Sequence, residues 1–157
     1  MPTPPADIDL AALLGEWHIV ATTLPFWRGK RAPRIRYTPL PDGRWGDELR
    51  WEQPRWWGAV AAKRLAGADT PVDGAPGRFV WRGAGVLGVL ASEWCFVEVG
   101  PGAAWCATWF ARASFGATPE GMDVYARDAG FDPTSAMAGL EARADLPKIP
   151  GWYRPER

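Results

Sequence analysis

Short apolar segments recur along this chain at intervals of about 8 to 12 residues, and Gly, Pro and Asp residues separate them. This spacing is typical of an all-β barrel or sandwich. We predict strands over 16–23, 34–40, 44–52, 56–66, 78–83, 86–91, 93–99 and 104–112. Pro41-Asp42-Gly43 and Gly100-Pro101-Gly102 indicate hairpin turns. Because no long helical crossover interrupts the segments, the sequence predicts an all-β, eight-stranded antiparallel up-and-down barrel.

Helical signals flank the predicted barrel. A short helical turn precedes Gly15. Thr118-Pro119-Glu120 is typical of a helix start and Gly130 of its end, and Asp132-Pro133 predicts a second short helix through about Arg143. We therefore expect one domain over 1–157, with the barrel at 15–112, a helical region at 118–143 packed outside it, and an irregular tail at 144–157.

Composition excludes several classes of protein. The formal net charge is zero, which argues against a nucleic-acid binder and against a polybasic membrane-surface protein. No run of apolar residues is long enough for stable membrane insertion. The amino terminus has neither a cationic nor an apolar run, so we expect no secretory signal and a cytoplasmic location. Cys95 and Cys106 are then expected to be reduced thiols, with a redox-responsive cross-strand disulfide as the alternative.

Three separated patches carry a family resemblance. They are Gly15-Glu16-Trp17, Ser92-Glu93-Trp94 and Trp109-Phe110-Ala111-Arg112, in that order along the chain. The pattern resembles the lipocalins, and Ala129-Gly130-Phe131-Asp132 is similar to the carboxyl end of bacterial lipocalins. The resemblance implies that Gly15 and Trp17 open the first strand and that Arg112 packs over Trp17 to close one end. It also implies a barrel that holds one small molecule.

Strand alternation places the large rings on one barrel face. Trp17 is expected to face inward, as are pairs of rings in the third, fifth, seventh and eighth predicted strands, including Trp105 with Trp109. We predict a ligand pocket lined by Trp45, Leu49, Trp51, Trp57, Phe79, Trp81, Trp94, Phe96 and Trp109. The alternative is that these rings fill a solid core.

Basic residues cluster between the first two predicted strands. Arg34 and Arg36 are the candidates for a cationic rim that would hold the carboxylate or phosphate of an amphipathic anion such as a fatty acid. The alternative is a solvated loop whose charges have no ligand.

The chain offers few residues for metal or hydrolytic chemistry. His18 is the single histidine and is expected to face away from Trp17, so we predict no metal site, no cofactor and no Ser-His-Asp relay. The leading hypothesis is a barrel that carries or sequesters a hydrophobic or amphipathic small molecule. The alternatives are a cyclase or isomerase, with candidate acid–base groups Asp47, Glu93, Glu98 and Tyr37, or a solid barrel that binds proteins. The sequence leaves the oligomeric state open.

Overall fold

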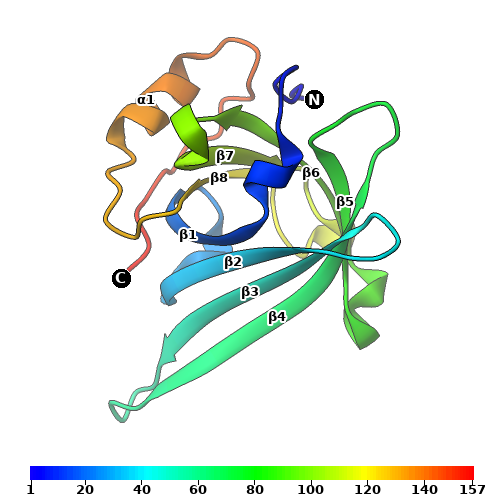
Figure 1. The fold of residues 1–157 in the computed structure, drawn as a ribbon. Helices are drawn as coiled ribbons and strands as arrows, with labels where there is room; N and C mark the ends of the chain where they lie inside the picture. Colours follow the sequence, from blue (N-terminus) through cyan, green and yellow to red (C-terminus); the bar gives the residue numbers. More distant parts are fainter.

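The computed structural model describes residues 1–157 as a closed barrel of eight antiparallel strands (Figure 1). The strands are β1 (Gly15–Thr22), β2 (Arg31–Pro39), β3 (Trp45–Pro54), β4 (Val60–Pro71), β5 (Arg78–Gly83), β6 (Ala91–Val99), β7 (Trp105–Phe110) and β8 (Gly121–Ala126). Each strand pairs with the next along the chain, and β8 returns to pair with β1. The predicted up-and-down barrel is confirmed.

Short helices lie in several of the segments between and beyond the strands. Five are 3₁₀ turns: η1 (Leu10–Leu13), η2 (Pro25–Trp27), η3 (Gly85–Val89), η4 (Pro101–Ala103) and η5 (Ser114–Gly116). The one α-helix is α1 (Thr134–Ala142), which confirms the helix predicted after Asp132-Pro133. The Asp132 carboxylate accepts a hydrogen bond from the Thr134 backbone N–H at 3.0 Å and so satisfies a free donor at the helix start. No helix is long and apolar enough to cross a membrane.

The two ends of the barrel differ. We call one end the closed end; it carries η1 and the connections 40–44, 72–77 and 100–104. We call the other end the mouth; it carries the connections 23–30, 55–59, 84–90 and 111–120. The side chain of Asp9 caps η1 by accepting from the backbone N–H groups of Ala11 and Ala12. This turn places Leu13 across the closed end, where it is fully buried.

The last barrel strand lies where the sequence predicted a helix. Residues 121–126 form β8, so the barrel extends to Ala126 rather than ending at 112. Every residue of β8 is buried, because its inner face lines the barrel and its outer face is covered. Met122 and Val124 pack outward with Ala136 and Leu140 of α1, which lies beside β7 and β8 in Figure 1. A strand buried on both faces does not show clear polar–apolar alternation. The sequence of residues 121–126 therefore gave no strand signal, and the preceding Thr-Pro-Glu led to the prediction of a helix.

The predicted strand at 86–91 is instead the turn η3. The chain reverses tightly here, because a Cβ atom at Gly83 would lie 2.5 Å from the Cβ of Leu87. Strand β6 then begins at Ala91, slightly before the predicted strand at 93–99. The predicted number of strands, eight, is thus correct. The predicted strand at 86–91 does not exist, however, and the strand at 121–126 was not predicted.

Candidate functional site

The barrel interior at the closed end is a packed aromatic core. The Trp94 ring lies between Tyr37 and Phe79, stacked on each, with ring centroids 5.5 and 4.8 Å away. Trp45 and Phe96 pack against the same group, and all five rings are buried. This half of the interior is solid, as the alternative interpretation of the ring pattern expected.

Trp17 and an arginine seal the closed end. The indole N–H of Trp17 donates to the Leu13 carbonyl at 2.9 Å, and the Arg127 guanidinium lies 3.5 Å above the Trp17 ring centroid. Gly15 adopts φ +96°, and a Cβ there would meet the Arg127 guanidinium at 3.2 Å. The predicted Arg112 is exposed and lies just beyond β7. The arginine over Trp17 therefore follows β8, and its assignment to Arg112 was wrong because β8 was interpreted as a helix.

The mouth half of the interior is open to water. Strand register directs into it a set of side chains that are only partly buried, namely Leu49, Trp51, Leu65, Trp81, Ser92 and Phe110. Trp51 packs edge-on against Phe26 and Trp27, at centroid distances of 5.6 and 6.1 Å. Inward-facing side chains that remain partly exposed indicate that water enters from the mouth. Rings and aliphatic side chains thus form a partly exposed, largely apolar inner surface, which we call the chamber.

A group of polar side chains is buried inside the barrel, in and beside the aromatic core. We call it the polar layer; its members are Tyr37, Asp47, Asp69, Thr108, Asp123 and Tyr125. Tyr37 lies opposite Asp47 in the β2–β3 register, and Thr108 lies opposite Asp123 in the β7–β8 register. The Trp94 indole N–H donates to an Asp69 carboxylate oxygen at 2.8 Å. The polar layer is thus anchored on several strands and cannot move as a loop would.

Several buried polar atoms in the interior have no hydrogen-bond partner of good geometry, although some of these groups lie close to one another. They are the Tyr37 hydroxyl, the Thr108 hydroxyl, one oxygen of each of Asp47, Asp69 and Asp123, and the Trp51 indole nitrogen. Buried polar groups are nearly always hydrogen-bonded in native proteins, and each orphan costs about 1–3 kcal/mol. Their concentration inside one barrel leaves hydrogen-bonding capacity that water or a bound molecule could use.

Burial sets the protonation of the three carboxyl groups. It raises the pKa of Asp47 to about 7, while a hydrogen bond with Asp69 acts in the opposite direction. The pKa of Asp69 is raised well above its ordinary value, first by burial and then by the neighbouring Asp47 charge. Burial likewise raises the pKa of Asp123 to about 7, against weaker hydrogen bonds that include one from Thr22. The layer therefore holds protons near neutral pH and can both donate and accept hydrogen bonds.

The structure brings most of the predicted ring positions together. Trp45, Phe79, Trp94 and Phe96 belong to the inner core, and Leu49, Trp51 and Trp81 pack against it from the mouth side. Trp57 lies in the 55–59 connection and is exposed.

Trp109 faces outward, contrary to the prediction. Trp94 lies opposite Phe110 in the β6–β7 register, so Phe110 shares the inner face of Trp94. Trp109 and Trp105 belong to the outer layer beside α1, and the Trp109 indole N–H donates to Glu120 at 2.8 Å. Alternation within one strand could not determine which face of β7 points inward.

The predicted cationic rim does not form from Arg34 and Arg36. Ile35 and Tyr37 point inward on β2, so the arginines between them face outward. Arg36 pairs with Glu16 at 2.9 Å, and Arg34 lies 3.9 Å from the same carboxylate. Lys30 lies beside the chamber, with its ammonium over the rings of Phe26 and Trp51. Lys63 lies opposite Trp51 in the β3–β4 register, on the same face as Leu65.

The remaining candidate residues lie outside the interior. Glu93 pairs with Arg78 and Glu98 with Arg143, so neither faces the chamber. His18 lines a surface pocket of about 350 Å³ next to Arg34 and the end of the tail. No group of three or more His, Cys, Asp or Glu side chains lies close enough together to hold a metal ion.

The two cysteines do not pair. Both are free and buried, with Cys95 in the outer layer and Cys106 in the inner core. A register shift between Phe96 and Glu98 on β6 reverses which residues of β6 and β7 point to the same side of the sheet. Cys95 and Cys106 therefore lie on opposite faces. The alternative of a cross-strand disulfide is therefore not met in this structure.

Sequence reasoning missed four members of the polar layer. Tyr37 and Asp47 were candidates, whereas Asp69, Thr108, Asp123 and Tyr125 were not. A signal was present for the last two, because Asp123 and Tyr125 are two apart and so share one face of a strand. Interpreting 118–130 as a helix concealed it.

Known proteins resemble this chain in structure rather than in sequence. No family model matches the chain, and no curated protein matches it. Lobster apocrustacyanin A1 superimposes with a TM-score of 0.62 at 12% identity, covering 94% of this chain and 78% of that one. The siderocalin Ex-FABP superimposes with a TM-score of 0.53 at 17% identity, covering 83% of each chain. This chain has the lipocalin fold.

Within this lipocalin fold, stacked rings fill the closed end, and the polar layer is buried in and beside them. The partly exposed chamber lies toward the mouth. At 12% and 17% identity, the similarity establishes the barrel alone. Any function has to be argued from the chamber and the polar layer.

Proposed function

We propose that this protein binds a small, largely apolar molecule in the mouth half of its barrel and carries or sequesters it. The observation that carries the proposal is the set of buried polar atoms with unused hydrogen-bonding capacity, next to a partly exposed inner surface lined with rings. Small-molecule sites typically combine apolar walls with a few directed polar groups. A bound molecule with polar groups at its inner end would satisfy those atoms.

The chemistry of the polar layer selects the kind of ligand. Three carboxyl groups and two phenols face the interior, and no arginine or lysine lies among them. A carboxylate or phosphate placed there would meet like charge or neutral acids without a cation. A hydroxyl or an amine would instead donate to the carboxyl oxygens. We therefore propose a neutral or cationic inner end for the ligand, in place of the fatty-acid-like anion expected from the arginines.

The structural neighbours support a ligand-binding barrel in a general sense. The siderocalin Ex-FABP is described as functioning through dual ligand specificities, which is a property of that protein. We extend only ligand binding to this chain. We also propose a cytoplasmic location, because two free and buried thiols suit a reducing compartment.

A matched ligand series tests the proposal. Dodecylamine, dodecanol and dodecanoate share one apolar chain and differ at the end group, so quenching of tryptophan fluorescence ranks the end groups directly. We expect the amine and the alcohol to bind about tenfold or more tightly than the carboxylate. Asp47→Asn and Asp123→Asn should weaken amine binding, whereas Glu93→Gln, which changes an outward carboxylate, should not. Tighter binding of dodecanoate, or no binding of any of the three, would refute the proposal.

A reaction in the chamber is the second candidate function. The observation that favours it is that burial raises the pKa of Asp47 and of Asp123 to about 7, the range suited to general acid–base catalysis. An isomerase or cyclase of a hydrophobic molecule would use such a group to move a proton while the rings exclude water. Mass spectrometry of a molecule purified with the protein, after incubation in D₂O, distinguishes the two functions. Deuterium uptake by the bound molecule, abolished by Asp123→Asn, would indicate an enzyme. No deuterium uptake would indicate a carrier.

A further inference from the structure

The exposed apolar side chains gather at one end of the molecule. Six of the seven large hydrophobic side chains that are exposed lie on mouth connections or directly beside them; we call them the mouth patch, and they are Trp56, Trp57, Val60, Val86, Val89 and Phe115. The seventh is Met1. Scattered exposed apolar residues need no explanation, but a set confined to three loops around one opening indicates a contact surface.

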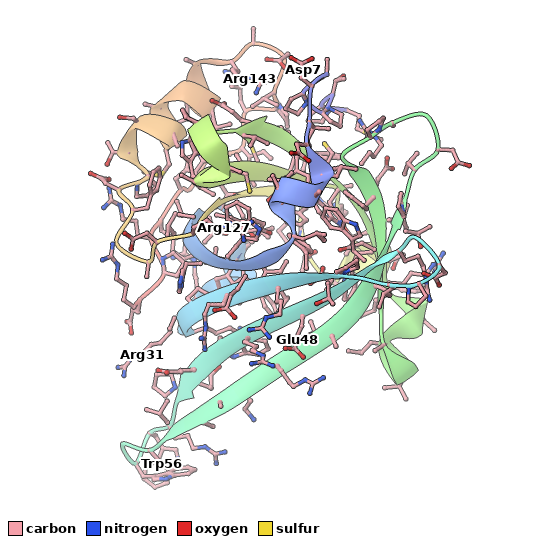
Figure 2. All side chains as sticks on the ribbon, viewed as in Figure 1. Asp7, Arg31, Glu48, Trp56, Arg127 and Arg143 are labelled. Atoms are coloured by element: carbon pink, nitrogen blue, oxygen red, sulfur yellow. The ribbon has the colours of Figure 1, made fainter.

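The β3–β4 hairpin carries the largest part of the mouth patch beyond the barrel. Strand β4 pairs with β5 only from Gly67 onward, so residues 60–66 extend past that neighbour. Figure 1 shows the hairpin projecting well beyond the other loops, and Figure 2 shows Trp56 at its tip. Trp56 is 93% exposed and meets only Trp57 edge-on, with ring centroids 5.4 Å apart. The tip of this hairpin can therefore contact a deformable surface ahead of the rest of the barrel.

A second mouth loop holds an aromatic ring in solvent at a conformational cost. Phe115 adopts φ +58°, in the left-handed region that a residue with a side chain rarely occupies. Its ring is 86% exposed, so no packing within the chain compensates for this conformation. Strained residues that present an exposed side chain are characteristic of binding surfaces.

The charges of the chain are distributed unevenly between the two ends. The mouth connections contain four basic residues, Arg28, Lys30, Arg55 and Arg112, and a single acidic residue, Glu120. The closed-end connections, together with residues 1–14, contain Asp7, Asp9, Asp42 and Asp73 against Arg44. The zero net charge therefore conceals a cationic mouth opposite an acidic end. Three of the mouth cations lie over rings: Arg28 over Tyr153, Lys30 over Phe26 and Arg55 over Trp57.

We propose that the mouth docks on an anionic lipid surface. Exposed tryptophans interleaved with lysine and arginine are the composition of segments that lie in a membrane interface, where rings sit at the headgroups and cations meet anionic lipids. The patch consists of separate loop tips rather than one flat or concave face. That shape suits a deformable bilayer better than the close-packed core of a protein interface. The protein lies on the membrane in this arrangement and does not span it.

Docking goes beyond the proposed binding of a small molecule, although it would place the chamber against the lipid in which an apolar ligand dissolves. It rests on the mouth patch and on the charges and not on the polar layer. Vesicle binding can be measured without any ligand, so the two proposals fail separately.

Vesicle flotation tests the docking proposal. The probes are vesicles of phosphatidylcholine alone and of phosphatidylcholine with phosphatidylglycerol. We expect binding to the anionic vesicles that weakens in high salt, and little binding to the neutral ones. The double change Trp56→Ser and Trp57→Ser should reduce binding about tenfold or more. Phe115→Gly should also reduce binding while keeping the fold, because glycine adopts this backbone conformation freely.

Charge changes at the two ends provide the matched control. Arg55→Glu at the mouth should reduce binding to the anionic vesicles about tenfold or more, because it removes a cation and adds an anion next to the lipid surface. Arg44→Glu makes the same change in an exposed hairpin of the closed end and should leave binding unchanged. Equal effects of the two changes, or equal binding to neutral and anionic vesicles, would overturn the proposal.

Site-specific labels report which end touches lipid. Cys95 and Cys106 are buried, so a new surface cysteine can be labelled selectively with a polarity-sensitive fluorophore. Ala59→Cys lies at the hairpin tip and Ala104→Cys at the closed end, and both positions are exposed. We expect vesicles to shift the emission of the first label to the blue and not the second. Full vesicle binding with no emission shift at position 59 would contradict docking by the mouth. A protein that binds no vesicles but forms a dimer in solution, and loses that dimer with Trp56→Ser, would instead use the mouth patch to bind a second copy.

Discussion

At the scale of single residues, one arginine carries much of the closed end. The Arg127 guanidinium stacks on Trp17 and donates hydrogen bonds to the carbonyls of Glu16, Ala12 and Leu14 at 2.7–2.8 Å. It therefore joins β8, β1 and η1 through one planar group with five donors. The guanidinium donates hydrogen bonds to all three carbonyls at the same time. A lysine ammonium has no planar fork of donors and would not reach all of them.

We expect Arg127→Ala to lower the free energy of unfolding by about 2–3 kcal/mol, because it removes the stacking and leaves three carbonyls without a donor. Arg112→Ala is the control, and it should change stability by less than about 0.5 kcal/mol, since that side chain is exposed. Urea unfolding followed by circular dichroism measures both. A larger effect at Arg112 than at Arg127 would contradict the assignment of the sealing arginine.

At the scale of secondary-structure elements, β8 determines whether the barrel closes. It pairs with both β7 and β1, and its outer face supports α1. Its first residue, Gly121, lies against the mouth loop so closely that a Cβ atom would come within 2.2 Å of a Leu24 methyl. A larger residue at this position requires the Leu24 side chain to move.

A pair of alanine substitutions distinguishes the strand from the helix that the sequence suggested. In a helix, Gly121→Ala would stabilise the protein by about 1 kcal/mol. In β8 it should destabilise by about 1–3 kcal/mol, because Leu24 has to move. Gly139→Ala in the middle of α1 is the control, since a Cβ atom added there would meet open space. It should raise the free energy of unfolding by about 0.5–1 kcal/mol, and urea unfolding measures both changes.

At the scale of the whole molecule, the polar layer makes stability depend on pH. Burial raises the pKa of Asp47 and Asp123 to about 7 from an ordinary value of 3.8. Between these values the folded protein binds more protons than the unfolded chain, so the free energy of unfolding falls as pH rises. Below about pH 4 both states are protonated and the difference disappears.

We therefore expect stability to decrease between about pH 4 and about pH 7.5, by at most about 4 kcal/mol for each of the two carboxyl groups, as measured by urea unfolding at several pH values. Changing Asp47 and Asp123 together to Asn, which resembles the protonated carboxyl, should flatten this dependence. Stability that rises over the same range would show that these carboxyl groups are ionised in the folded protein.

Local signals in the chain were sufficient for most of the barrel. The turn residues at 41–43 and 100–102, the alternation in β3 and β5, and the Gly15–Trp17 start each depend on near neighbours in sequence. They predicted the number of strands, the up-and-down order and the inward direction of Trp45, Phe79 and Trp94. These features could be predicted because strand periodicity and turn chemistry are properties of a few consecutive residues.

Other features depended on contacts between distant parts of the chain. The inner face of β7 follows from Trp94 lying opposite Phe110, and β8 was concealed because α1 covers its outer face. The polar layer forms only when strands from across the barrel bring Asp69, Asp123 and Tyr125 to one level.

By itself, the sequence determined that this chain forms an antiparallel barrel with inward rings, because turns and alternation act over short stretches. Tertiary structure alone decided which arginine seals the closed end, which face of each strand lines the interior, and where three acids are buried. The physical reason is that register and burial are set by pairing between strands. A single strand does not specify its partner's position.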